Sequence, residues 1–168
     1  MKKCIILQIN YLILICLFIP CVAIAQPICQ IQRFSAYNGL AQRSVTNILQ
    51  DSKGFIWFST WNGLNKFDGY TFKNYKAFPG DGCTLTSNRL AKITQTQTCD
   101  IWCQTYDLRI YLFDSRREKF IDILRPYENE KQQTYAVQNV YTLPKGVSWI
   151  VCDRGAFRID EQAYKAQE

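Results

Sequence analysis

Apolar positions recur along this chain with a long and regular period. Trp57, Trp102 and Trp149 are spaced 45 and 47 residues apart. The apolar, glycine and aspartate positions around Trp57 recur around Trp149 after a shift of 92 residues without a gap. The apolar and aspartate positions also recur around Trp102, with one inserted residue. Self-similarity at a fixed period of this length is the sequence signature of stacked structural repeats. The chain is therefore predicted to contain three such units.

Within the first unit, the pattern predicts a small antiparallel sheet. The run 55–60 is largely apolar, which is typical of a strand buried on both faces. Asn62-Gly63 is the favoured two-residue hairpin connection, and Asp51 and Gly54 suit a turn because Asp hydrogen-bonds locally and Gly accepts positive φ. The strands expected are residues 45–49, 55–60, 64–67 and 70–75. Four strands in one repeat describe a propeller blade.

We therefore predict an all-β fold, a partial β-propeller of about three four-stranded antiparallel blades. A leading strand and an N-terminal signal segment are expected before the blades. The expected divisions are residues 1–25 for the signal peptide, 26–44 for the leading strand and its loop, 45–84 for blade 1, 85–126 for blade 2, and 127–168 for blade 3 with a truncated tail. The alternative architecture is a β-sandwich, but its strands would not share a repeated tryptophan.

The chain has fewer blades than a closed ring, since propellers close with about four to eight. Residues 31–37 are expected to form a leading strand, because the segment from Phe34 to Tyr37 echoes the segment from Phe72 to Tyr75. In a ring such a strand completes the final blade. Exposed sheet edges and apolar faces favour association. The missing blades, or another copy of the chain, are therefore expected partners.

The repeated tryptophans and glycines are predicted to be structural. Blade packing accounts for the three tryptophans because their strands are apolar, and the glycines mark turns. The aspartates Asp68, Asp114 and Asp160 also recur at one place, which favours turn chemistry over acid–base catalysis. The predicted structural core consists of Trp57, Trp102, Trp149, Gly54, Gly63, Gly146 and Gly155.

The first 26 residues differ in kind from the rest. Lys2 and Lys3 precede an apolar stretch over residues 5–19, Pro20 breaks it, and small residues at Ala23 and Ala25 suit a signal peptidase. Export to the periplasm with cleavage after Ala25 is therefore predicted. An uncleaved segment that tethers the chain to the membrane is the alternative. No other contact with a membrane is expected.

The composition of the chain excludes several classes of binding site. Without the signal segment the chain has 18 Lys and Arg against 14 Asp and Glu, a net charge of +4 with no basic cluster, so nucleic-acid binding is not expected. The chain contains no histidine, which excludes a Cys/His metal site. Five cysteines follow the signal segment, and small buried apolar residues are the favoured reading of them. No cofactor, metal site or catalytic residue is predicted.

Candidate binding residues lie where the second strand of each unit ends. Trp61 has Tyr106 and Asp153 as its counterparts, and the next position carries Asn62, Asp107 and Arg154. Aromatic rings can cover the apolar faces of sugars while amides and charged groups bind hydroxyls. These six residues are the candidate ligand-binding set, with surface aromatics and ordinary turn residues as the alternative interpretation.

The first unit closely resembles the two-component regulator propeller repeat. The residues that carry the resemblance are Gly39, Leu40, Ser44, Val45, Ile48, Asp51 to Trp57, Thr60, Gly63 to Asn65, Phe67 to Tyr70, Phe72 and Tyr75. The resemblance extends over about residues 31–160. The second unit departs from it, with Cys99-Asp100 and Leu108 where glycines are expected, and the third has Leu143-Pro144 at a turn.

The resemblance implies a role as the periplasmic, oligosaccharide-sensing region of a hybrid two-component histidine kinase. The expected function is thus a ligand-sensing propeller fragment that lacks kinase and regulator modules and is not an enzyme, since a kinase needs a phosphoacceptor histidine. Two alternatives remain. One is a fragment of a secreted propeller enzyme of the lyase or glycosidase kind, and the other is a self-associating interaction module.

Overall fold

The computed structural model describes residues 29–77 and 85–162. The chain divides into two compact units, residues 1–33 and 34–168. The described part of the first unit, residues 29–33, forms no helix or strand. The predicted signal peptide over residues 1–25 lies outside the described residues.

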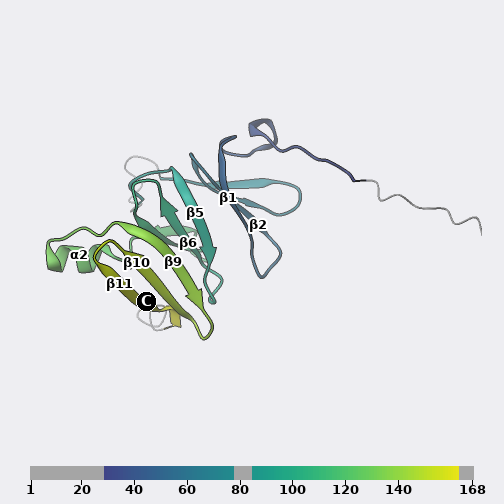
Figure 1. Ribbon diagram of the computed structural model, residues 1–168. Coiled ribbons are helices and arrows are strands. Elements are labelled where there is room, and N and C mark those ends of the chain that lie inside the picture. Colours follow the sequence, from purple (N-terminus) through teal and green to yellow (C-terminus); the bar gives the residue numbers. More distant parts are fainter. Residues whose placement is uncertain (1–28, 78–84, 163–168) are drawn as a thin grey trace, which may run out of the picture. The chain divides into compact units, whose positions relative to one another are not determined.

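The second unit contains three antiparallel sheets that follow one another along the chain (Figure 1). The first sheet consists of β1 (Val45–Gln50), β2 (Ile56–Thr60), β3 (Gly63–Phe67) and β4 (Phe72–Tyr75). The second consists of β5 (Leu90–Gln95), β6 (Ile101–Thr105), β7 (Ile110–Asp114) and β8 (Lys119–Ile121). The third consists of β9 (Val137–Leu143), β10 (Val147–Cys152) and β11 (Gly155–Asp160).

The three sheets are successive blades of a partial β-propeller, as predicted. In each sheet the strands pair in chain order, and the repeated tryptophan lies in the second strand, at Trp57, Trp102 and Trp149. The first strands are neighbours, since β1 contacts β5 and β5 contacts β9 (Figure 1). This is the arrangement of inner strands in adjacent propeller blades.

Two apolar cores lie between the blades, one on each face of the second sheet. The core shared with the first sheet contains Trp57, Leu64, Tyr75, Leu85, Leu90, Ile93, Ile101, Cys103, Tyr111, Phe113 and Phe120. The core shared with the third sheet contains Trp102, Ile110, Leu112, Leu124, Tyr135, Val137, Val140, Ile150 and Cys152. Neighbouring residues of β6 and β7 enter opposite cores because side chains alternate along a strand. Both strands are buried throughout.

The third sheet has three strands in the described residues, one fewer than predicted. After β11 the chain leaves the sheet at Glu161, whose buried carboxylate accepts a hydrogen bond from the Ser148 hydroxyl at 2.5 Å. The carboxylate also accepts one from the Gln97 N–H at 2.8 Å. These bonds satisfy the buried acid at the boundary between the second and third blades.

The connection between the second and third blades contains the helix α2 (Arg125–Lys131). Glu128 in this helix accepts hydrogen bonds from the two terminal guanidinium nitrogens of Arg109, at 2.7 and 2.6 Å. It also accepts one from the Tyr135 N–H at 2.9 Å. Asp122 lies 3.3 Å from the same guanidinium. These contacts fix the helix to Arg109, the residue immediately before β7.

The predicted leading strand over residues 31–37 is not formed. Residues 29–44 contain only one short 3-10 turn, η1 (Ala36–Asn38). A strand needs the hydrogen-bonding edge of another strand, and residues 31–37 pair with none of the described strands. Instead the Phe34 ring packs against Phe67 and Phe72, with centroids 4.9 and 5.6 Å apart. Side-chain burial therefore replaces strand pairing at the outer face of the first sheet.

The hairpin between β2 and β3 turns one residue earlier than predicted. Thr60 pairs with Gly63, so the turn residues are Trp61 and Asn62. Gly63 has φ of 96°, and a Cβ there would lie 2.3 Å from the Tyr75 carbonyl oxygen. Leu108 takes the corresponding place in the second blade and still adopts φ of 60°. The repeated backbone path thus overrides the preference of a leucine against left-handed φ.

The three tryptophans predicted to lie in the core differ in their exposed fraction. Trp57 and Trp102 are only 2% and 1% exposed, as predicted, but Trp149 is 37% exposed, so its assignment to the core is wrong. Its neighbour Ile150 enters the core shared with the second blade, so Trp149 points to the opposite face of the sheet. In the described part of the chain no further sheet covers that face.

The four glycines predicted as structural also divide. Gly63 and Gly146 are buried, whereas Gly54, in a turn, and Gly155, the first residue of β11, are exposed and lie outside the core. All four have positive φ. Their shared role is therefore a backbone conformation that favours glycine, and burial follows only where another segment passes close by.

The recurring aspartates act in turns, as predicted. The Asp68 carboxylate accepts hydrogen bonds from the N–H groups of Tyr70 and Thr71. These bonds lower its pKa, with the bond from Thr71 as the largest cause. Asp114 and Asp160 likewise accept bonds from N–H groups two residues ahead.

Candidate functional site

The turns that carry the candidate binding residues are fixed by one repeated hydrogen bond. The N–H of Trp61 donates to the Ser44 carbonyl at 3.3 Å, that of Tyr106 to Arg89 at 3.0 Å, and that of Asp153 to Ala136 at 3.0 Å. In each blade the bond joins the residue that follows the second strand to the residue immediately before the first strand. We call residues 61–62, 106–107 and 153–154, with these three acceptors, the rim.

At the rim two aromatic rings from adjacent blades come together. The ring centroids of Trp61 and Tyr106 are 6.2 Å apart with an angle of 88° between their planes, an edge-to-face contact. The side chains are 42% and 50% exposed. Trp61 follows β2 and Tyr106 follows β6, so the pair bridges the boundary between the first two blades. An exposed aromatic pair of this kind presents apolar area together with polar edges.

The Arg89 side chain lies against both rings. Its guanidinium carbon is 4.6 Å from the Trp61 ring centroid and 5.6 Å from that of Tyr106. These are cation–π distances. Arg89 is thus a rim residue that the sequence comparison missed. It could have been found by comparing the residues that precede the first strand of each unit, where Ser44 and Ala136 are small and uncharged.

Asn62 and Asp107 lie on the same two turns and are partly engaged. The Asn62 side-chain amide donates to the Ala41 carbonyl at 3.3 Å. Asp107 accepts a hydrogen bond from the Thr86 hydroxyl at 3.0 Å. Thr86 in turn lies 2.7 Å from the Tyr111 hydroxyl. Both polar residues therefore help to hold the turns.

Asp153 and Arg154 form a separate pair on the third blade. One Asp153 oxygen accepts from the Ala136 N–H at 3.1 Å, and the other lies 3.4 Å from Nε of Arg154. Among the contacts of the described residues, none joins this pair to Tyr106. The structure thus brings together Trp61 and Tyr106 from the predicted set, adds Arg89, and leaves Asp153 and Arg154 with a local role.

A second cleft opens on the outer strands of the first blade. It encloses about 280 Å³ and is lined by Phe55, Lys66, Asp68, Thr71, Lys73, Tyr75 and Glu118. Lys73 and the Tyr75 hydroxyl both donate to Glu118, at 2.6 and 2.9 Å. The bond from Lys73, followed by that from Tyr75, lowers the pKa of Glu118. Burial, followed by the bond to Glu118, raises the pKa of Tyr75. The charged groups here largely satisfy one another.

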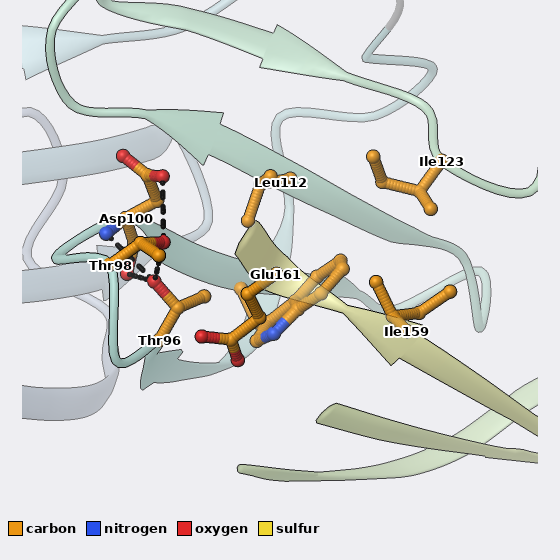
Figure 2. Close-up of a pocket in the computed structure, with 8 residues that line it drawn as sticks. Thr96, Thr98, Asp100, Leu112, Ile123, Ile159 and Glu161 are labelled. Atoms are coloured by element: carbon orange, nitrogen blue, oxygen red, sulfur yellow. Dashed lines mark hydrogen bonds between the residues drawn. The ribbon is translucent and has the colours of Figure 1, made fainter. Parts of the chain in front are cut away.

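A narrow crevice lies between the second and third blades (Figure 2). Figure 2 shows Thr96, Thr98 and Asp100 linked by hydrogen bonds beside Glu161. The Trp102 indole N–H, at the base of the crevice, donates to the Ser148 hydroxyl at 2.9 Å. Every polar group named here has a partner within the protein, so the crevice is a packed polar boundary between blades.

Among residues 29–77 and 85–162, no three metal-ligating side chains lie together. The four cysteines in this part of the chain, Cys29, Cys99, Cys103 and Cys152, are all unpaired thiols. Burial raises the pKa of Cys103, which keeps this thiol protonated. None of the helices described is long and apolar enough to span a membrane.

Residues 39–62 match the family model of the two component regulator propeller. This segment is therefore similar to one repeat of a two-component regulator propeller. The matched segment contains β1, β2 and the turn with Trp61, so it includes both the tryptophan that packs between blades and the first aromatic residue of the rim.

Similar proteins extend the likeness of this chain. Over 53 residues it is 47% identical to histidine kinase P4 of Formosa agariphila, a match that covers 32% of this chain and 4% of that protein. The extracellular domain of the hybrid two component system BT3049 from B. thetaiotaomicron is 27% identical with a TM-score of 0.64. The corresponding domain of the BT4673 system is 20% identical with a TM-score of 0.55 and supports the fold alone.

Both structural matches cover 79% of this chain but only 19% of the solved extracellular domain. This chain is therefore similar to a small part of a propeller-type extracellular domain of a two-component sensor system. This agrees with the fold and family predicted from the repeat.

Proposed function

We propose that this chain is a ligand-sensing propeller of a two-component system that binds oligosaccharides at the rim, in the periplasm, without catalysis of its own. The observation that carries the proposal is the exposed edge-to-face pair of Trp61 and Tyr106, contributed by adjacent blades. Aromatic rings of this kind cover the apolar faces of sugar rings. The similarity to extracellular sensor domains supports the same assignment.

The rim is a better binding surface than the cleft on the first blade or the crevice between the second and third blades. In the outer cleft, Lys73 and Tyr75 are both committed to Glu118, and the crevice beside Trp102 is narrow and internally bonded. At the rim, by contrast, the two rings remain about half exposed and the backbone beneath them is held by the repeated hydrogen bond. A rigid backbone under exposed rings suits recognition because little order is lost on binding.

The test is a titration of the exported chain with a panel of neutral and acidic oligosaccharides, followed by calorimetry and tryptophan fluorescence. Trp61→Ala and Tyr106→Ala should each weaken binding by about tenfold or more, since a stacked ring contributes on the order of 1.4 kcal/mol. Tyr70→Ala is the matched control, because Tyr70 is an exposed aromatic in the turn before β4, outside the rim. Binding that the rim variants leave unchanged, or no binding to any oligosaccharide, would contradict the proposal.

We also propose that the open face of the third blade packs against another blade, in a longer propeller or in a second copy of this chain. Trp57 packs against the second blade, with its ring centroid 5.7 Å from that of Phe113, and Trp102 packs in the core shared with the third. Trp149 occupies the same place in its own sheet. Continuation of this repeated interface is the specific observation that favours an additional partner.

A further inference from the structure

Arg89 is an addition to the rim that the blade does not need for folding. Its carbonyl accepts the Tyr106 N–H at 3.0 Å, and its own N–H donates to the Ser87 hydroxyl at 3.2 Å. Arg89 makes both bonds through its backbone, so neither involves its side chain. Ser44 and Ala136 make the same carbonyl contact in the first and third blades without a charged side chain. The guanidinium therefore has to be explained by something other than the repeat.

The two aromatic rings fix where this guanidinium lies. It sits 4.6 Å from the centroid of Trp61 and 5.6 Å from that of Tyr106. Neither ring is a hydrogen-bond acceptor of the ordinary kind, so these contacts leave the N–H donors of the guanidinium for other partners. Arg89 itself is exposed. The rings thus hold an arginine in position with its donors open to solvent.

No carboxylate of the described chain forms an ion pair with Arg89. The two acidic residues at the rim have other partners: Asp107 accepts from the Thr86 hydroxyl, and Asp153 is shared between the Ala136 N–H and Arg154. By comparison, Arg109 is bound by Glu128 and Asp122. Among the described residues, the rim therefore carries a positive group that forms no ion pair with a carboxylate.

From these contacts we infer that the rim selects acidic oligosaccharides, whose carboxylate or sulfate group binds Arg89 while a sugar ring contacts Trp61 and Tyr106. This inference deepens the proposed function and rests on it. A planar guanidinium binds carboxylates and sulfate-like oxyanions through paired N–H donors. The adjacent rings supply contact with the apolar face of the same or the next sugar.

The test compares ligands of one length that differ in charge: a neutral xylo-oligosaccharide, an oligogalacturonide as the carboxylate arm, and a sulfated oligosaccharide as the sulfate arm. The parent chain should bind at least one acidic ligand about tenfold or more tightly than the neutral one, and this preference should weaken as salt is raised. Arg89→Gln should abolish the preference while binding of the neutral ligand changes little.

Two further variants keep the outcome specific. Arg89→Lys retains the charge but not the planar pair of donors, so it should recover only part of the preference. Arg43→Gln removes an exposed arginine that precedes β1 and should leave the preference intact. Circular dichroism and the thermal midpoint of each variant verify that the blades remain folded.

The outcomes separate this inference from the proposed function. Equal binding of neutral and acidic ligands, both weakened by Trp61→Ala, would overturn the acidic preference and leave oligosaccharide binding in place. An acidic preference that survives Arg89→Gln but disappears in Arg43→Gln would also overturn it. If no ligand of the panel binds, both fail. A difference between the carboxylate and sulfate arms identifies the anion.

Discussion

Trp102 and Trp149 occupy the same position in successive blades but have opposite surroundings. Each lies in the second strand of its sheet and pairs with the first and third strands. Trp102 is 1% exposed and its indole N–H donates to Ser148 of the next blade. Trp149 is 37% exposed, because its face of the third sheet has no neighbouring sheet among the described residues.

The difference shows that a blade does not complete its own core. One face of the second sheet is covered by the blade before it and the other by the blade after it, as in other stacked repeats. The second sheet has both neighbours, and all residues of β6 and β7 are buried. The third sheet has one neighbour, and its β11 has no fully buried residue. Burial in this fold is therefore a property of the interface between blades.

The largest effect expected from this comparison is that of Trp102→Ala. Removing the ring leaves a cavity between the second and third blades and deprives the Ser148 hydroxyl of its indole donor. The free energy of unfolding should fall by about 3–5 kcal/mol, as measured by urea denaturation. Trp61→Ala, at the exposed rim, is the control and should cost much less. A similar loss in the two variants would mean that the interface between blades is not the main source of stability.

A smaller effect is expected at the connection that joins the same two blades. Glu128→Gln removes the charge that Arg109 binds through two hydrogen bonds, and should cost about 2 kcal/mol at neutral pH. Burial on its own would raise the pKa of Glu128, but the bonds from Arg109 and the Tyr135 N–H bring it below the usual value of 4.5.

This shift fixes the sign of the pH dependence. Because the folded-state pKa is lowered, Glu128 contributes its stability fully above pH 4.5 and loses it as the pH falls through the lowered pKa. Urea denaturation of the parent chain and of Glu128→Gln at several pH values should show a constant difference above this range and a shrinking one below it. A difference that grows on acidification would contradict the assignment.

The smallest effect is expected for Trp149→Ala. At concentrations where the chain is monomeric, the variant should lose about 1 kcal/mol or less, since the side chain is partly exposed. If the face packs against a second copy, size-exclusion chromatography should show an oligomer at high concentration that Trp149→Ala weakens. A loss as large as that of Trp102→Ala at every concentration would show that the face is always covered, and would end the contrast between the two tryptophans.

The sequence was sufficient to predict the blades. The spacing of Trp57, Trp102 and Trp149 located the second strand of each sheet, and the recurring aspartates were correctly assigned to turns. These features repeat because every blade has the same backbone path. The same path places Leu108 at a φ of 60°, where the first blade has Gly63.

The candidate site was predictable only in part. Trp61 and Tyr106 follow from their matching positions in the repeat, because equivalent strand ends of adjacent blades lie at the same rim. Arg89 occupies a position that the comparison of units did not consider. Its contact with both rings depends on how the first and second blades pack, and on the side-chain path between them.

The sequence alone determined that this protein is built from repeated antiparallel sheets with a tryptophan in each second strand. Local hydrogen bonding in the turns and side-chain alternation along the strands depend on residues within one repeat, and these residues recur. Only the tertiary structure decided that Trp102 is buried and Trp149 is not. It also decided that Phe34 packs against the first sheet without forming a strand, and that the Arg89 guanidinium contacts two rings. Each of these depends on a neighbour distant in sequence, which the pattern within one blade does not specify.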